Sequence, residues 1–528
     1  MTAFQEYRAM EKLKALAQSP IDLTKSGVLT PKRIEQLTAT HLGLKLLYGT
    51  ERVSEEVLEA LFQLAEEAKA VDKMIAMQQG VVINKIEGYQ SEERSVLHTA
   101  MRDFFDARIE ADKAKEATEL AYAELEKLKG FLDELEKQEF TDLIQVGIGG
   151  SELGPKAIYL ALEAFNKPNR RVHFVSNVDP DDTATVFSGV DLAKTLVVVV
   201  SKSGSTLETL TNEALIRQRF LDLGLSPEKH FIAVTGKGSP MDDPKRYLRS
   251  FYIWDYVGGR YSVTSMVGCV ALAFALGMEK LLDFLRGAQM MDKVARQNDP
   301  KKNLPLLSAL IGIWNHNFLN CPTTAVIPYS QAMHRFPAHL QQCDMESNGK
   351  RIDRQGQPVD FATGPIIWGE SGTNGQHSFY QLIHQGTIVV PIEFIGFVES
   401  QYGQDREEKE TTSQEKLLAN LFAQAIALAM GKQSDNPNQV FPGNRPSRIL
   451  LARRCDPSTV GMILAYFEHK VAFQGFIWDI NSFDQEGVQL GKVLANQLID
   501  LFTQKRRGAS DEKAFPLGRA YIQQMESL

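Results

Sequence analysis

A short stretch rich in hydroxyl groups follows the most apolar strand predicted in the chain. Four consecutive valines, 197–200, lead into Ser201, Lys202, Ser203, Gly204, Ser205 and Thr206, and a helical pattern begins directly afterwards. The hydroxyls and the ammonium would gather at the carboxyl end of a strand, where open α/β sheets bind ligands. A helix N-terminus at the same place would attract a phosphate monoester. The alternative is an ordinary helix cap with Glu208 completing a capping box, but capping would need only one hydroxyl.

A glycine-rich turn at residues 149–151 is a second candidate anion site. The apolar run 142–148 leads into this turn, and a helix is expected from about Pro155. Glycines allow the backbone to approach a ligand closely, and helix N–H groups attract an anion. A tight turn without a ligand explains the pattern equally well. A dinucleotide site is disfavoured because Glu152 stands where G-x-G-x-x-G has its third glycine, and its carboxylate would repel a pyrophosphate.

Arg260 follows two glycines, Gly258 and Gly259, just before another apolar helix. The glycines would let the arginine lie close to a ligand. Its guanidinium stays protonated and donates in a fixed fork, which suits the stabilisation of a developing negative charge. A surface arginine in a tight turn is an equally good interpretation of the same residues.

Two residues able to move protons lie in surroundings that favour no catalytic role. Glu346 stands at the edge of a Ser-Asn-Gly turn, where a solvated loop glutamate is the ordinary interpretation. Lys492 lies on a predicted helix, and at about 100° per residue it falls opposite the apolar stripe. That stripe comprises Leu490, Val493, Leu494, Leu498 and Leu501. The spacing therefore predicts a solvated lysine.

Two histidines lie on a helix predicted to be capped by Thr373. His377 and His384 are seven residues apart and share a face. The opposite, buried face would carry Phe379, Leu382 and Ile383. A surface histidine pair is the ordinary interpretation, because a metal site needs more ligands than this segment offers.

Composition narrows the class of protein. The chain has 528 residues, more than one hydrophobic core usually supports, and 43% are hydrophobic and 23% charged, as in soluble globular proteins. A net charge of −8 argues against nucleic acid as the main partner, although a few focused cations could bind a small anion. The four cysteines form no C-x-x-C pair. No secretory signal and no membrane-spanning run are expected, so these features predict a cytoplasmic protein.

The order of the elements predicts an α/β fold. Residues 1 to about 140 show helical spacing, for example at 54–77 and 112–137. Strand-like runs then alternate with helical stretches, which is typical of a parallel sheet covered on both faces. These runs lie at 142–148, 171–176, 195–201, 230–235 and 251–257, and then at 323–330, 364–369, 387–398 and 447–454. We therefore predict two α/β domains in succession, with polar loops at 341–358 and 433–447, and a helical tail after a flexible hinge from residue 505.

In their order along the chain, six segments together resemble the phosphoglucose isomerase family. They are VGIGGSELGP, S-K-x-x-x-T-x-E-T, GGRYS, ESNGK, GTNGQHSFYQLIHQG and QLGK. The match spans about residues 140 to 500. It implies two sugar-isomerase-type (flavodoxin-like) domains with mostly parallel sheets, a helical N-terminal segment and a C-terminal helical arm. The implied boundaries are 1–115 for the segment, which packs on the second domain, 116–288 and 289–503 for the two domains, and 504–528 for the arm.

The resemblance also implies a reaction and a role for each motif residue. The reaction would be the reversible isomerisation of D-glucose 6-phosphate and D-fructose 6-phosphate through a cis-enediol, in glycolysis and gluconeogenesis, without cofactor or metal. Glu346 would carry the proton between C2 and C1, and Arg260 would stabilise the enediol. His377 and Lys492 would open the sugar ring, with His377 supplied by the other subunit of a homodimer whose active sites are shared. The phosphate pocket would comprise Gly150, Ser151, Ser201, Lys202, Ser203 and Thr206, and the sugar contacts Gln342 and Gln485.

Two positions depart from the family pattern. Ser203-Gly204-Ser205 replaces the more frequent Thr-Phe-Thr, and Thr264 stands where a tryptophan is usual. Both changes bear on affinity and loop rigidity more than on the type of reaction. Two other functions remain to be weighed. A phosphosugar sensor without activity would not need Glu346, His377 and Lys492 together, and a nicotinamide oxidoreductase is disfavoured by Glu152.

Overall fold

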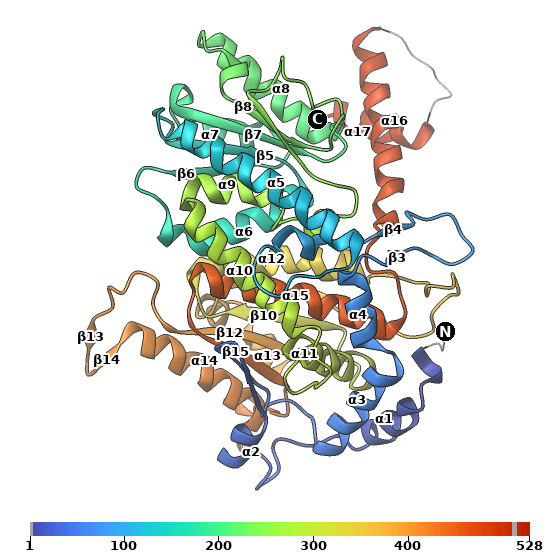
Figure 1. Cartoon of the computed structure of the whole chain (residues 1–528). Coiled ribbons are helices and arrows are strands. Elements are labelled where there is room, and N and C mark those ends of the chain that lie inside the picture. The colour runs from blue at the N-terminus through green and yellow to red at the C-terminus, as the bar shows by residue number, and fades with distance from the viewer. Residues whose placement is uncertain (1–3, 509–514) are drawn as a thin grey trace. The chain divides into compact units, whose positions relative to one another are not determined.

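A computed structural model describes residues 4–508 and 515–528 of the chain, which form two compact units. The first unit ends at Ser482 and the second begins at Phe483. The first unit contains a five-stranded and a six-stranded sheet, and helices α10 (Met278–Val294) and α15 (Pro457–Trp478) lie between them (Figure 1). The predicted α/β class is confirmed. The bounds predicted for the four parts of the chain stay predictions.

The five-stranded sheet is parallel throughout. Its strands are β5 (Asp142–Val146), β6 (Arg171–Val175), β7 (Thr195–Ser201), β8 (Phe231–Thr235) and β9 (Arg249–Tyr252), in the order β6-β5-β7-β8-β9. Strand β7 is buried at every position, which explains its continuous apolar sequence. The helices that follow these strands are α6 (Leu153–Leu162), α7 (Pro180–Phe187), α8 (Leu207–Asp222) and α9 (Met266–Leu276). The stretch Gly259–Leu276 has the length and composition to cross a membrane, but 94% of it is buried within the protein.

The six-stranded sheet is mixed. Its parallel part contains β10 (Thr323–Pro328), β11 (Ile366–Trp368), β12 (Ile392–Glu399) and β15 (Ser447–Arg454). Two N-terminal strands, β1 (Thr38–His41) and β2 (Leu44–Leu47), complete it, and β2 runs antiparallel to β15. The prediction that the N-terminal region is helical is therefore wrong at 38–47. These strands have only four residues each, too few for alternation to be distinguished from helical spacing.

The N-terminal region is otherwise mostly helical. Its helices are α1 (Ala9–Ala17), α2 (Pro31–Gln36), α3 (Glu55–Glu67), α4 (Ala70–Gln78) and α5 (Asp112–Leu135). The helix predicted over 54–77 is two helices, because Lys69 between them has a left-handed backbone with φ of 52°. A small hairpin, β3 (Val82–Asn84) and β4 (Arg94–Ser95), separates α4 from α5.

The polar segment at 341–358 is helical at its start, so the predicted loop is too long. Helix α12 (Phe336–Leu340) continues as a π-helix over Gln341–Glu346. The remaining helices of this unit are α11 (Leu304–Ile313), α13 (Tyr380–Gln385) and α14 (Ser413–Met430), and a short hairpin, β13 (Glu407–Glu408) and β14 (Thr411–Thr412), precedes α14. Thr373 makes no side-chain cap, and Leu382 is 48% exposed, so the cap and part of the stripe predicted there are wrong.

The second unit contains α16 (Gln489–Arg506) and α17 (Pro516–Glu526). The predicted helical tail is thus confirmed over α17. Leu501 is the one buried residue of α16, and Leu490, Val493 and Leu494 of its apolar stripe are exposed. The predicted hinge falls largely on residues 509–514, outside the described part of the chain.

Candidate active site

Glu346 is the last residue of the π-helix, and its carboxylate is held at one oxygen. Its Oε2 accepts hydrogen bonds from Arg260 Nη1 at 3.1 Å and from Gln342 Nε2 at 3.2 Å. The Glu346 side chain is 23% exposed, whereas that of Arg260 is only 1% exposed. Within the described residues both side-chain bonds of this carboxylate involve Oε2, so Oε1 could accept a proton. The solvated loop glutamate expected from the local sequence is therefore wrong.

Arg260 is a buried arginine, not a surface one. Its Nε donates to Ser347 Oγ at 2.7 Å, and its Nη2 donates to the carbonyl oxygen of Ser482 at 2.6 Å. A buried guanidinium is tolerated only where its donors and its charge find partners. Glu346 supplies the charge, and the other two partners fix the orientation of the fork.

The two glycine-rich turns meet beside this pair. A Cβ atom on Gly150 would lie 2.3 Å from the carbonyl carbon and oxygen of Gly259, which only a glycine avoids. Ser262 Oγ donates to the carbonyl oxygen of Gly259 at 2.6 Å and to that of Gly150 at 3.5 Å. The turn after β5, which ends in Ser151, and the turn that carries Arg260 thus form one surface.

The hydroxyl-rich loop after β7 has hydroxyl–hydroxyl contacts in place of a helix cap. Ser201 Oγ lies 2.9 Å from Thr206 Oγ1, and Ser205 Oγ donates to Ser203 Oγ at 3.0 Å. Thr206 is the N-cap residue of α8 but makes no side-chain capping bond, so the capping-box alternative is wrong. Gly204 has φ of 66°, a left-handed backbone that explains why glycine occupies this departure from the family pattern.

Lys202 connects this loop to the arginine turn. Its Nζ donates to the carbonyl oxygens of Asp255 at 3.4 Å and Val257 at 3.2 Å, just before Gly258. Burial lowers the pKa of this ammonium, and the nearby charge of Arg94 lowers it further. The two predicted anion-binding motifs, Arg260 and Glu346 are therefore linked by contacts within the first unit.

Three predicted residues are not part of this cluster. His377 lies on the 3-10 helix Asn374–His377 with an exposed side chain, and no hydrogen bond within residues 4–508 joins it to Glu346. Lys492, which is exposed, and Gln485 belong to the second unit. The roles of all three stay predictions. His384, the partner of His377 in the predicted surface pair, bonds Gln424 Oε1 at 2.8 Å and has a structural role in holding α13 against α14.

Two residues to which the sequence motifs assign no role also belong to the cluster. Ser347 accepts the bond from Arg260, and Tyr261 has its hydroxyl 2.8 Å from Ser347 Oγ. The signals for them in the sequence are that they belong to the motifs ESNGK and GGRYS and that they directly follow Glu346 and Arg260. Thr264, the other departure from the family pattern, is 1% exposed, and its hydroxyl has no partner among the described side chains and backbone.

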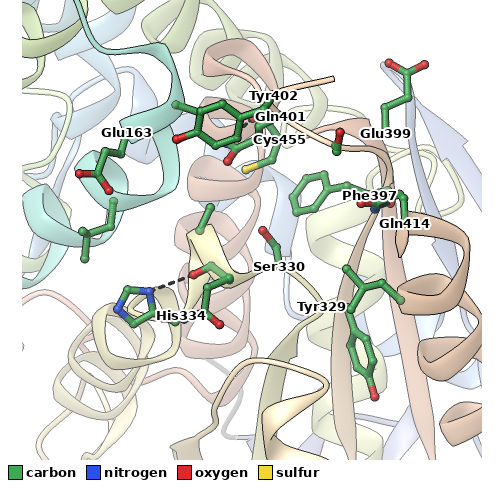
Figure 2. A pocket seen from close by; sticks show the side chains of 16 residues that line it. Glu163, Tyr329, Ser330, His334, Phe397, Glu399, Gln401, Tyr402, Gln414 and Cys455 are labelled. Atoms are coloured by element: carbon green, nitrogen blue, oxygen red, sulfur yellow. Dashed lines mark hydrogen bonds between the residues drawn. The ribbon is translucent and has the colours of Figure 1, made fainter. Parts of the chain in front are cut away.

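A separate pocket of about 380 Å³ lies at the carboxyl ends of β10 and β12 (Figure 2). Glu163 and Glu399 line it, and its lining contains neither lysine nor arginine. Such a pocket suits a phosphate ester poorly, because its two carboxylates repel an anion and no lysine or arginine in the lining binds one. Within residues 4–508 and 515–528 no group of three or more His, Cys, Asp or Glu side chains is placed to hold a metal ion.

Comparison with known proteins identifies the family. A family model described as phosphoglucose isomerase matches residues 47–514. The chain is 58% identical over 525 residues to the glucose-6-phosphate isomerase of Protochlamydia amoebophila, covering 99% of this chain and 97% of that protein. It is 53% identical to that of Desulfotalea psychrophila, covering 99% of this chain and 98% of that protein. A crystal structure of a glucose-6-phosphate isomerase from Chlamydia trachomatis superposes with a TM-score of 0.95 at 49% identity, over 100% of both chains. The chain therefore belongs to the phosphoglucose isomerase family.

Proposed function

We propose that this protein interconverts D-glucose 6-phosphate and D-fructose 6-phosphate by ring opening and proton transfer through a cis-enediol. The names of its relatives and its family support the substrate pair. The single observation that carries the mechanism is the partly exposed Glu346 carboxylate, held at Oε2 by Arg260 Nη1 at 3.1 Å. This arrangement offers a base and a cation within one hydrogen bond of each other.

In the proposed reaction Glu346 Oε1 takes the proton from C2 of the open-chain sugar and returns it to C1. Negative charge develops on O1 when C2 is deprotonated, and the Arg260 guanidinium stabilises it. The hydroxyl proton moves from O2 to O1 before C1 receives its hydrogen, so that C2 becomes the carbonyl carbon. Because Arg260 is almost completely buried, its charge is poorly screened by water and already oriented, so little reorganisation is needed. Gln342, which shares Oε2 with Arg260, would contact the sugar.

The phosphate would bind at the loop 201–206 and the turn at Gly150 and Ser151, where hydroxyls and the N-terminus of α8 come together. Binding of this remote group supplies energy that holds a flexible open chain against Glu346. No cofactor is proposed.

Ring opening is assigned to His377 and Lys492, and a sugar contact to Gln485. We propose that the protein works as a homodimer in the cytoplasm and that His377 acts in the active site of the second subunit. The exposed side chain of His377 is compatible with such a role, because it is available to another chain. Imidazole suits the step, since it both accepts and donates a proton near neutral pH.

Glu346→Gln tests the function. Glutamine keeps the size and the acceptor for Arg260 but removes the base, so turnover of fructose 6-phosphate should fall about 10²- to 10⁴-fold with binding retained. The turnover is measured by a coupled assay of the glucose 6-phosphate that is formed. Adding EDTA should leave the rate unchanged. Glu399→Gln, in the other pocket, is the control and should keep wild-type turnover. Full activity of Glu346→Gln, or loss of activity in Glu399→Gln, would place the chemistry elsewhere.

A further inference from the structure

Two consecutive residues contact the guanidinium of Arg260, and the next one supports it indirectly. Glu346 Oε2 accepts from Nη1 at 3.1 Å, and Ser347 Oγ accepts from Nε at 2.7 Å. Asn348 acts one step away, because its Oδ1 accepts from Ser482 Oγ at 2.7 Å, and the carbonyl of Ser482 accepts from Nη2 at 2.6 Å. Each nitrogen of the fork therefore has an acceptor.

A buried side chain fixes Ser347 in turn. It is fully buried, and the Tyr261 hydroxyl lies 2.8 Å from its Oγ. The Tyr261 ring is itself 1% exposed and stacks on His98, with 4.8 Å between ring centroids. Burial raises the pKa of Tyr261, so the phenol keeps its proton and its hydrogen bond at working pH. The hydroxyl that receives Nε of Arg260 is thus held in one place.

We propose that Ser347, held by Tyr261, is a positioning residue that sets the plane of the Arg260 guanidinium and so aims Nη1 at Glu346 and at the enediol oxygens. This inference rests on the proposed function. The Nε bond determines rotation of the fork about the end of the side chain, whereas the Nη bonds alone would permit tilting. Electrostatic stabilisation depends on such preorganisation, and it acts on the transition state more than on substrate binding.

The protein contains a chemically matched pair outside this cluster. Ser308 on α11 is fully buried, and its Oγ accepts from Arg448 Nε at 3.1 Å. Arg448 on β15 is also buried, and its Nη1 donates to Glu51 Oε1 at 2.8 Å. Ser308→Ala therefore removes the same kind of hydrogen bond, from serine to a buried arginine, without touching the site.

The test compares kcat and KM for fructose 6-phosphate in Ser347→Ala, Arg260→Lys and the double variant. A hydrogen bond to a charged group contributes about 1.5–3 kcal/mol, which corresponds to a loss of about 10- to 100-fold in kcat for Ser347→Ala. KM should stay within about threefold. Lysine has no Nε–H group to donate to Ser347. The kcat of the double variant should therefore lie within about threefold of that of Arg260→Lys alone. Ser308→Ala should lower the melting temperature comparably and keep kcat within about twofold of wild type.

If the losses in kcat caused by Ser347→Ala and Arg260→Lys multiply in the double variant, the two effects are independent and the proposal is overturned. A general structural defect in Ser347→Ala would give this result, because it would lower kcat whether or not Arg260 is present. Wild-type kcat in Ser347→Ala would overturn the proposal as well. Should Ser347→Ala fail to fold, Tyr261→Phe keeps the ring on His98 and removes only the hydroxyl, and its kcat should fall severalfold at unchanged KM. Inactivity of the wild-type protein toward fructose 6-phosphate would instead refute the proposed function.

Discussion

Gly150→Ala should move catalytic groups by a distance that the structure defines. The new Cβ would lie 2.3 Å from the carbonyl of Gly259, about 1 Å closer than ordinary van der Waals contact. Both contact atoms are backbone, so the two turns must separate by about that distance. Arg260 follows Gly259 directly, and its 3.1 Å contact to Glu346 would lengthen beyond hydrogen-bonding range. A misplacement of about 1 Å costs about 10²-fold in rate, which we expect for kcat/KM.

The assay is the coupled turnover of fructose 6-phosphate, together with thermal unfolding. Gly259→Ala is the sharpest comparison, because its Cβ would meet only the Cα of Gly150, at 3.9 Å, and it should stay within about threefold of wild type. Gly130→Ala, within α5 and with open space around it, should keep activity and raise stability by up to about 1 kcal/mol. Unchanged activity of Gly150→Ala, or equal damage by Gly259→Ala, would refute the reasoning.

Two further outcomes are expected. Gly204→Ala forces a Cβ onto a backbone with φ of 66°, at 2.8 Å from Ser239 Oγ. The loop should therefore shift, and KM for fructose 6-phosphate should rise about five- to tenfold. A fall in kcat at constant KM would contradict a phosphate-binding role for this loop. The buried His339 has no hydrogen-bond partner among the described residues, and burial lowers its pKa from 6.5 to about 4. The unfolded chain therefore takes up this proton first, and the free energy of unfolding should fall by up to about 3 kcal/mol between pH 6.5 and pH 4. Urea unfolding of His339→Leu should show a correspondingly flatter pH dependence, and an identical slope would exclude this histidine as the cause.

Much of the parallel sheet structure is predictable from sequence, because buried parallel strands are continuous apolar runs. Each of the nine predicted runs overlaps an observed strand, although the run predicted at 251–257 shares only its first two residues with β9. The strands β1 and β2 escape prediction because their partner, β15, lies about 400 residues away in sequence and their own four-residue patterns are weak. A hairpin of this kind gains its stability from the sheet that it joins, not from its own sequence.

The site was less predictable, and for a related reason. Glu346 and Arg260 stand 86 residues apart, and each has local surroundings typical of an exposed residue. A base held beside a buried arginine is a tertiary arrangement that leaves no periodic trace. The residues that break local rules are those expected at functional sites, where stability is exchanged for reactivity. The resemblance to a known family identified Glu346 and Arg260, because family motifs reflect tertiary contacts, whereas the spacing of apolar residues reflects only local structure.

The attachment of β2 to β15 has a consequence for how the chain is made. The Thr50 hydroxyl bonds the carbonyl of Ser447 across 397 residues, whereas the five strands from β5 to β9 come from one continuous stretch. During synthesis the five-stranded sheet can form early. The hairpin β1–β2 cannot pair with β15 until most of the polypeptide has left the ribosome. A nascent chain stalled before residue 447 would carry an unpaired sheet edge, the kind of surface that chaperones shield against aggregation.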